Sequence, residues 1–161
     1  MTTADRLLGR FLRLWRPRSV LALGAPLPGP LTEYAAAHDA ALRTLGIVRD
    51  VGALQSLGRF DLAVVTNQLE RVPHRDGAEL LGRLKNLHTG RVCVLVAPRV
   101  EHGVEWHSND FLGLGFIEPR DQDRQAEQRF FYYDLGSYNP ERRWNNPSGW
   151  ANPENFRRYR W

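Results

Sequence analysis

Apolar residues gather in two short runs between residues 60 and 97, and both runs predict buried strands. Residues 60–66 (FDLAVVT) and 91–97 (RVCVLVA) are mainly apolar and contain several β-branched side chains, which is typical of strands covered on both faces. The residues between them have helical periodicity instead. A strand, a helix and a strand in this length predict a βαβ unit, in which a right-handed crossover joins two parallel strands.

The helix of this unit is predicted by its two ends and by one apolar stripe. Asp76 has the residue type of an N-cap, and Glu79, three residues later, fits the capping box. Gly90 is the expected end, because glycine tolerates the left-handed conformation that closes many helices. The stripe recurs at helical spacing and comprises Ala78, Leu80, Leu81, Leu84 and Leu87.

The N-terminal third of the chain predicts two helices around a strand. An amphipathic helix is expected over Ala4–Arg16, and packing of its apolar face on the domain is favoured over binding to an anionic membrane. Ser19–Gly24 (SVLALG) is a predicted strand that runs into a proline-rich loop. A second helix is expected over Leu31–Leu45, with Gly46 as its C-cap, and Ile47–Val51 is a candidate for a short strand.

The region after residue 97 predicts a short helix and an antiparallel hairpin. Ser108 or Asn109 is the expected cap of the helix. Two strand candidates follow, Phe116–Arg120 and Arg129–Leu135, with the polar segment Asp121–Gln128 between them. Such a pair gives the predicted sheet an antiparallel edge.

The last segment differs from the rest in composition. Residues 137–161 combine six aromatic residues with five arginines and only two glutamates, a surplus of three positive side chains. This many aromatic residues argue against disorder, so we expect the segment to pack on the domain. Arginine mixed with tryptophan and tyrosine also suits a protein interface, and less specifically the bases and phosphates of a nucleic acid.

Length and composition fit a single domain with a sizeable core. The chain has 161 residues, and its formal net charge of +4 is too small to imply nucleic acid by itself. Its one cysteine, Cys93, lies in a predicted buried strand, so no disulfide is expected. No apolar run approaches the length of a membrane span, and a cytoplasmic location is the expectation. We divide the chain into a domain over residues 1–136 and a tail over residues 137–161.

Three stretches resemble the class I S-adenosylmethionine-dependent methyltransferases. Residues 20–24 stand where the family's first strand enters its glycine-rich cofactor loop, and 60–65 with 69–72 are similar to its fourth strand and the following turn. Residues 80–96 look like the next helix and fifth strand. The resemblance implies an α/β fold: a Rossmann-like, doubly wound, mostly parallel sheet with a C-terminal antiparallel hairpin. The tail resembles that of a bacterial group of uncharacterised, methyltransferase-like proteins.

Departures from the family pattern fall in its cofactor loop. The family usually has an acidic residue two positions before its first loop glycine, where this chain has Ala22. Gly24 is kept, but Pro26 and Pro28 follow it, and proline fixes φ and removes an N–H donor. No clear second strand is visible between residues 31 and 46. Asp50 is therefore a substitute for the family's ribose-binding carboxylate, or equally the end of a third strand.

The candidate site lies at the carboxyl ends of the strands, where open α/β sheets bind ligands. The residues expected to line it are Gly24, Ala25, Asp50, Thr66 and Asn67, with Gln68 beside them. Thr66 and Asn67 could hydrogen-bond a small ligand, but satisfying the backbone of their own turn is the favoured interpretation. No catalytic residue is predicted. A second set of polar residues, His102, Glu105 and His107, has no familiar metal-site spacing, so no metal is expected.

These features favour a degenerate methyltransferase-like protein that acts as a non-catalytic binding or scaffold module. No cofactor is expected under this interpretation. The first alternative is an active methyltransferase with a divergent loop, which would use S-adenosylmethionine. The second alternative is an RNA-binding accessory protein that uses the tail, although a protein partner for the tail is preferred.

Overall fold

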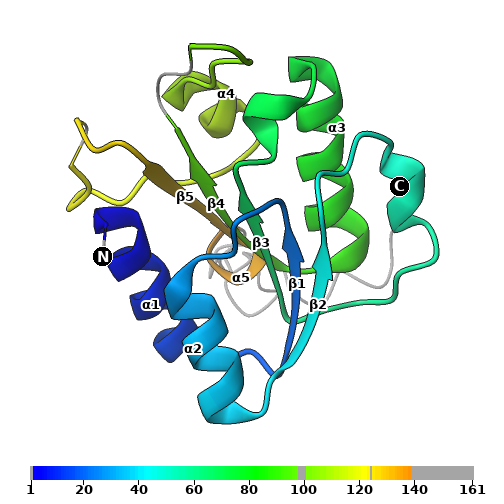
Figure 1. Cartoon of the computed structure of the whole chain (residues 1–161), viewed down its shortest axis with the longest axis vertical. Helices are drawn as coiled ribbons and strands as arrows, with labels where there is room; N and C mark the ends of the chain where they lie inside the picture. Colours follow the sequence, from blue (N-terminus) through cyan, green and yellow to red (C-terminus); the bar gives the residue numbers. More distant parts are fainter. Residues whose placement is uncertain (1, 98–100, 124, 139–161) are drawn as a thin grey trace, which may run out of the picture.

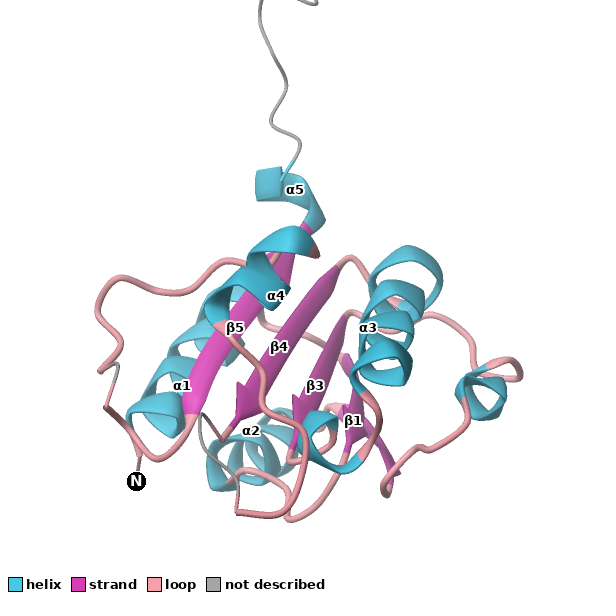
Figure 2. Ribbon diagram, turned by 90° about the horizontal axis from the view of Figure 1, so that it is seen from above, coloured by secondary structure: helices cyan, strands magenta, loops and turns pink. Residues whose placement is uncertain are grey.

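The structure is a computed structural model that describes residues 2–97, 101–123 and 125–138. Its centre is a five-stranded sheet in the order β2-β1-β3-β4-β5 (Figures 1 and 2). The first four strands are parallel, and β5 is antiparallel to β4. The predicted fold class, a doubly wound α/β sheet with an antiparallel edge, is confirmed. The strands are β1 (Ser19–Leu23), β2 (Ala41–Leu45), β3 (Leu62–Thr66), β4 (Arg91–Val96) and β5 (Arg129–Asp134).

Helices cover both faces of the sheet. On one face, α1 (Thr3–Trp15) and α2 (Gly29–His38) pack side by side (Figure 1). The other face carries α3 and the short α4. The remaining elements are α3 (His74–Arg83), the π turn η3 (Leu84–His88), α4 (Ser108–Gly113), the 3₁₀ turns η1 (Val51–Leu54) and η2 (Leu69–Arg71), and α5 (Leu135–Tyr138).

The residues of α1 favour a helix because they provide an N-terminal cap and one apolar face. The Thr2 side chain accepts a hydrogen bond from the backbone N–H of Asp5, and the Asp5 carboxylate accepts one from the backbone N–H of Thr2, which completes a capping box. Phe11, on the buried face, lies with its ring centroid 5.4 Å from that of Phe130 on β5. The apolar face of α1 therefore packs on the sheet, as predicted.

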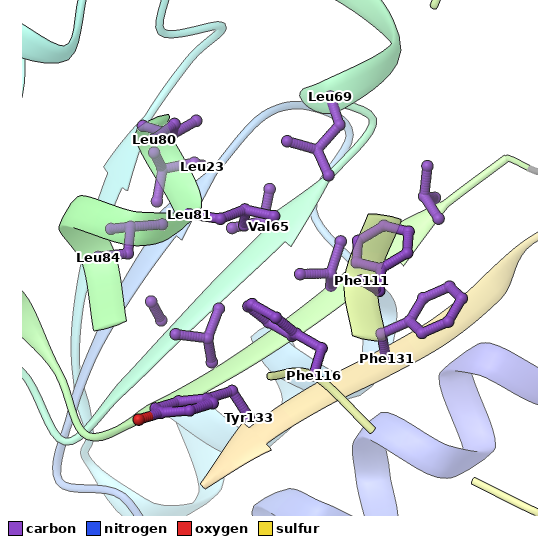
Figure 3. Packing of buried hydrophobic residues seen from close by; sticks show 14 of the residues in the cluster. Leu23, Val65, Leu69, Leu80, Leu81, Leu84, Phe111, Phe116, Phe131 and Tyr133 are labelled. Carbon is purple, nitrogen blue, oxygen red and sulfur yellow. The ribbon is translucent and has the colours of Figure 1, made fainter. Parts of the chain in front are cut away.

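The core on the opposite face joins α3 and α4 to the sheet (Figure 3). The Phe111 ring stacks on that of Phe131 with centroids 3.9 Å apart, and Trp106 is buried beside them. Aromatic pairs of this kind add to the stabilisation from burial alone. The labelled leucines of α3, its π turn and η2 complete this cluster: Leu69, Leu80, Leu81 and Leu84.

The predicted helix over Leu31–Leu45 is wrong in its second half. Helix α2 ends at His38, and Asp39 adopts the left-handed conformation (φ 50°) as its C-cap. Ala41–Leu45 then forms β2 at the edge of the sheet, in register with Ser19–Leu23 of β1. The second strand, which the sequence did not reveal, is therefore present.

Three smaller boundaries also differ from the predictions. Helix α3 begins at His74 after Pro73, so Asp76 lies inside its first turn and is not its N-cap. The π turn closes at Thr89, which is extended, in place of a left-handed Gly90. Residues 47–51 form no strand, and Val51 instead begins the 3₁₀ turn η1.

The predicted terminal hairpin is reduced to one strand and one bridge. Arg129–Asp134 forms β5, but Phe116–Arg120 contributes only an isolated antiparallel bridge between Ile117 and Tyr132. The antiparallel edge therefore depends on the pairing of β5 with β4. The division at residue 136 stays a prediction, and residues 139–161 of the tail lie outside the described residues. Within the part of the chain described, no helix has the length and apolarity needed to span a bilayer.

Candidate functional site

The carboxyl ends of β1 and β3 meet in direct backbone contact. Gly24, which follows β1, has φ 91°, and a Cβ on it would lie 1.7 Å from the carbonyl oxygen of Thr66 at the end of β3. Only glycine permits so close an approach in that conformation. The first turn after β1 is therefore pressed against the end of β3.

The loop between β1 and α2 offers few backbone donors. Pro26, Pro28 and Pro30 have no N–H group, and α2 begins at Gly29 without a side-chain cap. The N–H groups of Leu31 and Thr32 both point to the carbonyl oxygen of Pro28. The start of this helix therefore lacks most of the free N–H groups that bind anions at other helix N-termini.

Gln68 fills the space between the end of β3 and the segment that follows β2. Its side chain is fully buried, its Oε1 accepts the N–H of Val48 (2.8 Å), and its Nε2 donates to the carbonyl oxygen of Val48 (2.7 Å). Both polar groups of the amide are thus used within the protein. These two hydrogen bonds bind the backbone of Val48 as a neighbouring strand would, and they hold Val48 against the edge of the sheet.

A small polar pocket lies beside these residues. It has a volume of about 250 Å³ and is lined by Asn67, Glu70, Arg71, Ala97 and His102. Glu70 is 7% exposed, and its Oε1 accepts the N–H of Ala97 at 2.6 Å. Its Oε2 has no hydrogen-bond partner among the described residues. Burial raises the pKa of Glu70, against the opposing effect of the Ala97 N–H.

The turn that carries Glu70 is held from the outside by the loop before α4. The indole Nε1 of Trp106 donates to the carbonyl oxygen of Leu69 (3.3 Å), and the N–H of Val104 donates to the backbone carbonyl oxygen of Glu70 (2.9 Å). A Cβ on Gly77 of α3 would lie 2.6 Å from the Trp106 ring, so this helix also packs closely on the indole. The carboxylate of Glu70 is therefore positioned by well-packed neighbours.

Four of the five predicted site residues come together at this edge. Gly24 contacts Thr66, and Asn67, in the left-handed conformation with φ 46°, donates from its Nδ2 to the carbonyl oxygen of Ala25 at 3.5 Å. Asp50 has a different role, because its Oδ1 caps η1 by accepting the N–H of Gly52 at 2.8 Å.

The sequence did not single out Glu70. The available signal was a lone carboxylate in the turn that follows a buried strand. His102 lines the pocket, whereas His107 precedes α4 as its N-cap. Among the residues that the structure describes, no group of three or more histidine, cysteine, aspartate or glutamate side chains is placed to hold a metal ion. Cys93 is fully buried, and burial raises its thiol pKa well above the ordinary value, which disfavours the reactive thiolate.

Comparisons with known proteins place the fold. The model of a family described as "Family of unknown function (DUF6231)" matches residues 2–161. No curated protein matches the chain. Among solved structures, it is similar to apo SibL, an S-adenosylmethionine-dependent methyltransferase (14% identity, TM-score 0.57, covering 81% of this chain and 54% of that one). It is also similar to human N-acetylserotonin methyltransferase with S-adenosylmethionine, at 12% identity and a TM-score of 0.57, covering 82% of this chain and 51% of that one. PigF with S-adenosylhomocysteine is 13% identical with a TM-score of 0.54, covering 81% of this chain and 57% of that one.

These matches confirm the predicted resemblance to class I methyltransferases at the level of fold. Identities of 12–14% carry no further information about activity. The chain spans just over half the length of each of these three structures.

Proposed function

Since the chain belongs to this family of unknown function and has a methyltransferase-like fold, we propose that it is a non-catalytic binding module that does not hold S-adenosylmethionine. One observation carries the proposal: the backbone of Gly24 lies against the carbonyl oxygen of Thr66. An open α/β sheet binds its ligand in the crevice outside the carboxyl ends of its strands, where the strand order reverses. In this chain that position lies between β1 and β3, and the turn after β1 lies close against the end of β3 there.

Two further features support the same conclusion. The loop after β1 and the first turn of α2 lack three N–H groups because of Pro26, Pro28 and Pro30, so they have few donors for the carboxylate or ribose of a cofactor. The neighbouring pocket, at about 250 Å³, is smaller than the range of about 300–1,000 Å³ typical of sites for cofactor-sized ligands. The residues present at this edge therefore do not fit S-adenosylmethionine.

Isothermal titration calorimetry with S-adenosylmethionine and S-adenosylhomocysteine tests the proposal directly. We expect no saturable heat with either compound up to about 1 mM, a concentration at which a weak site of about 4 kcal/mol would be half filled. Binding of S-adenosylmethionine at micromolar affinity, with displacement by S-adenosylhomocysteine, would overturn the proposal.

An active methyltransferase with a divergent pocket is the second candidate, and the Glu70 pocket favours it. A buried carboxylate whose pKa is raised has the character of a general base. In this alternative Asp50 holds the cofactor, and Thr66 or Asn67 faces the substrate. An Asp50→Ala variant that keeps full affinity for S-adenosylmethionine would count against that assignment.

A further inference from the structure

A larger and mostly open surface pocket, called the cavity below, lies at the opposite, amino edge of the sheet. It has a volume of about 750 Å³, which falls within the range of small-molecule sites. Its walls come from four separate segments: the link between α1 and β1, the residues before β3, the start of β4 and the end of β5. The lining residues are Trp15, Arg16, Pro17, Arg18, Arg59, Phe60, Asp61, Gly90, Arg91, Asp134, Leu135 and Gly136.

The cavity is basic. Four arginines and two aspartates line it, which leaves a surplus of two positive charges (four minus two). Arg91 lies near Asp134, with its Nε 3.5 Å from the carboxylate. The other three, Arg16, Arg18 and Arg59, have no ion pair with any carboxylate in the described part of the chain.

The other carboxylate in the cavity, that of Asp61, accepts hydrogen bonds from the backbone. The Oδ2 of Asp61 accepts the N–H of Arg18 (2.8 Å) and the N–H of Ser19 (3.0 Å). Asp61 therefore holds the α1–β1 link in place, and its charge is partly balanced by the dipoles of these peptide groups. Within the described residues, the guanidinium groups of Arg16, Arg18 and Arg59 therefore have no ion-pair partner, although the charge of Arg18 also acts on Asp61.

The walls of the cavity are fixed by hydrogen bonds before any ligand arrives. Arg16 is held in the left-handed conformation by its N–H bond to Leu12, and the hydroxyl of Tyr34 donates to the carbonyl oxygen of Pro17 at 3.2 Å. On the other side, the N–H of Phe60 donates to the carbonyl oxygen of His88 at 2.8 Å. A preformed site avoids much of the entropy cost of ordering its walls on binding.

Aromatic side chains line the same cavity. Trp15 and Phe60 are both half-buried, and the guanidinium of Arg91 lies 5.2 Å from the centre of the Trp15 ring. Planar aromatic and guanidinium groups stack favourably on nucleobases, and arginine pairs with phosphate through several N–H groups at once.

We propose that this cavity binds a free mononucleotide, with its phosphate among Arg16, Arg18 and Arg59 and its base against Trp15 and Phe60. The combination of unpaired arginines and aromatic rings selects a ligand that has both an anionic group and a planar ring. The site lies at the other edge of the sheet from the crevice that methyltransferases use. It therefore does not depend on whether S-adenosylmethionine binds.

Calorimetry of the full chain with AMP, adenosine and inorganic phosphate tests the inference. AMP should bind, and it should bind at least about tenfold more tightly than either fragment, since each fragment makes only half of the contacts. Arg59→Gln should weaken AMP binding about tenfold, as expected for the loss of one charged contact. Arg43→Gln on the exposed edge strand β2 removes the same charge away from the cavity, and it should change AMP affinity less than twofold.

Four outcomes would overturn the inference. The first is no AMP binding at millimolar concentration, and the second is an equal loss of affinity in Arg59→Gln and Arg43→Gln, which would indicate non-specific charge attraction. The third is a 5′-phosphorylated RNA trinucleotide that binds when AMP does not, which would identify a nucleic-acid surface. The fourth is displacement of AMP by S-adenosylhomocysteine together with an AMP affinity that Arg59→Gln leaves unchanged. That result would place AMP in the methyltransferase crevice, and both this inference and the proposed function would fail.

Discussion

The carboxyl and amino edges of this sheet are built by the same strands, yet the segments that connect the strands pack differently at the two edges. At the carboxyl edge, Gly24 lies against Thr66, and the amide of Gln68 is fully used by Val48. At the amino edge, four arginines line a pocket of about 750 Å³, and within the described residues only Arg91 has a carboxylate partner. The sheet topology is common to both edges, so local packing accounts for the difference between them.

Two single residues distinguish the carboxyl edge: a glycine in a tight turn and a fully buried glutamine. Each of these is a single residue, so each can be tested by a single substitution.

The largest effect should come from Gly24→Ala. The added Cβ would lie 1.7 Å from the carbonyl oxygen of Thr66 at φ 91°, so the backbone must move, and we expect a loss of at least about 3 kcal/mol in the free energy of unfolding. Gly82→Ala, in α3 with no atom within 4 Å of its Cβ, should instead stabilise the protein by about 0.5–1 kcal/mol. Urea unfolding measures both. A stable Gly24→Ala protein would show that the crevice has room.

Gln68→Ala should have the second largest effect. It leaves the buried N–H and carbonyl groups of Val48 without their partner, which should cost about 2 kcal/mol after partial hydration. Gln55→Ala removes the same side chain from an exposed position and should cost less than about 0.5 kcal/mol. Equal losses in the two variants would mean that Gln68 does not hold the crevice closed.

Glu70→Gln should be stabilising, by about 1 kcal/mol at pH 8. The folded state raises the pKa of Glu70, so this residue's contribution to stability is complete below the ordinary pKa of about 4.3 and is lost as the pH rises through the folded value. The neutral amide has no such loss. The advantage of the variant should therefore grow from pH 4 to pH 8 in thermal unfolding. A destabilised Glu70→Gln protein at pH 8 would indicate that the ionised carboxylate has a partner.

Most of the fold could be predicted from the sequence because its inner strands are buried on both faces. The runs that form β1, β3 and β4 carry an apolar pattern strong enough to identify each of them. β2 could not be found in this way. It is an edge strand with no fully buried residue, and it continues the helical spacing of α2, so only its pairing with β1 defines it.

The candidate site was predictable only in part, for a related reason. A glycine at the end of the first strand and polar residues after the next buried strand are local signals, and they located Gly24, Thr66 and Asn67. The bond from Gln68 to Val48 joins residues 20 positions apart and depends on where β2 ends. The basic cavity at the amino edge gathers arginines from three separate segments, and no local pattern in the sequence indicates that they meet.

The smallest effect should come from Asp61→Asn at the amino edge, and its pH dependence should be opposite to that of Glu70. Although burial alone would raise it, the N–H groups of Arg18 and Ser19 lower the pKa of Asp61. Its contribution is therefore present above the ordinary value of about 3.9 and is lost as the pH falls through the lower folded value. Because Asp61 is exposed and water competes for these bonds, the variant should lose about 0.5 kcal/mol at pH 7, and this deficit should shrink towards pH 3.

The same substitution separates stability from binding at the amino edge. Asp61→Asn removes a negative charge from the wall of the basic cavity, so AMP should bind about twofold more tightly to a slightly less stable protein, since at an exposed site the interaction of two charges is weak. Calorimetry and thermal unfolding of one protein sample give both numbers. A loss of AMP affinity would mean that Asp61 contributes to the site mainly by holding Arg18 in place, because removal of the repulsive charge alone can only favour an anion.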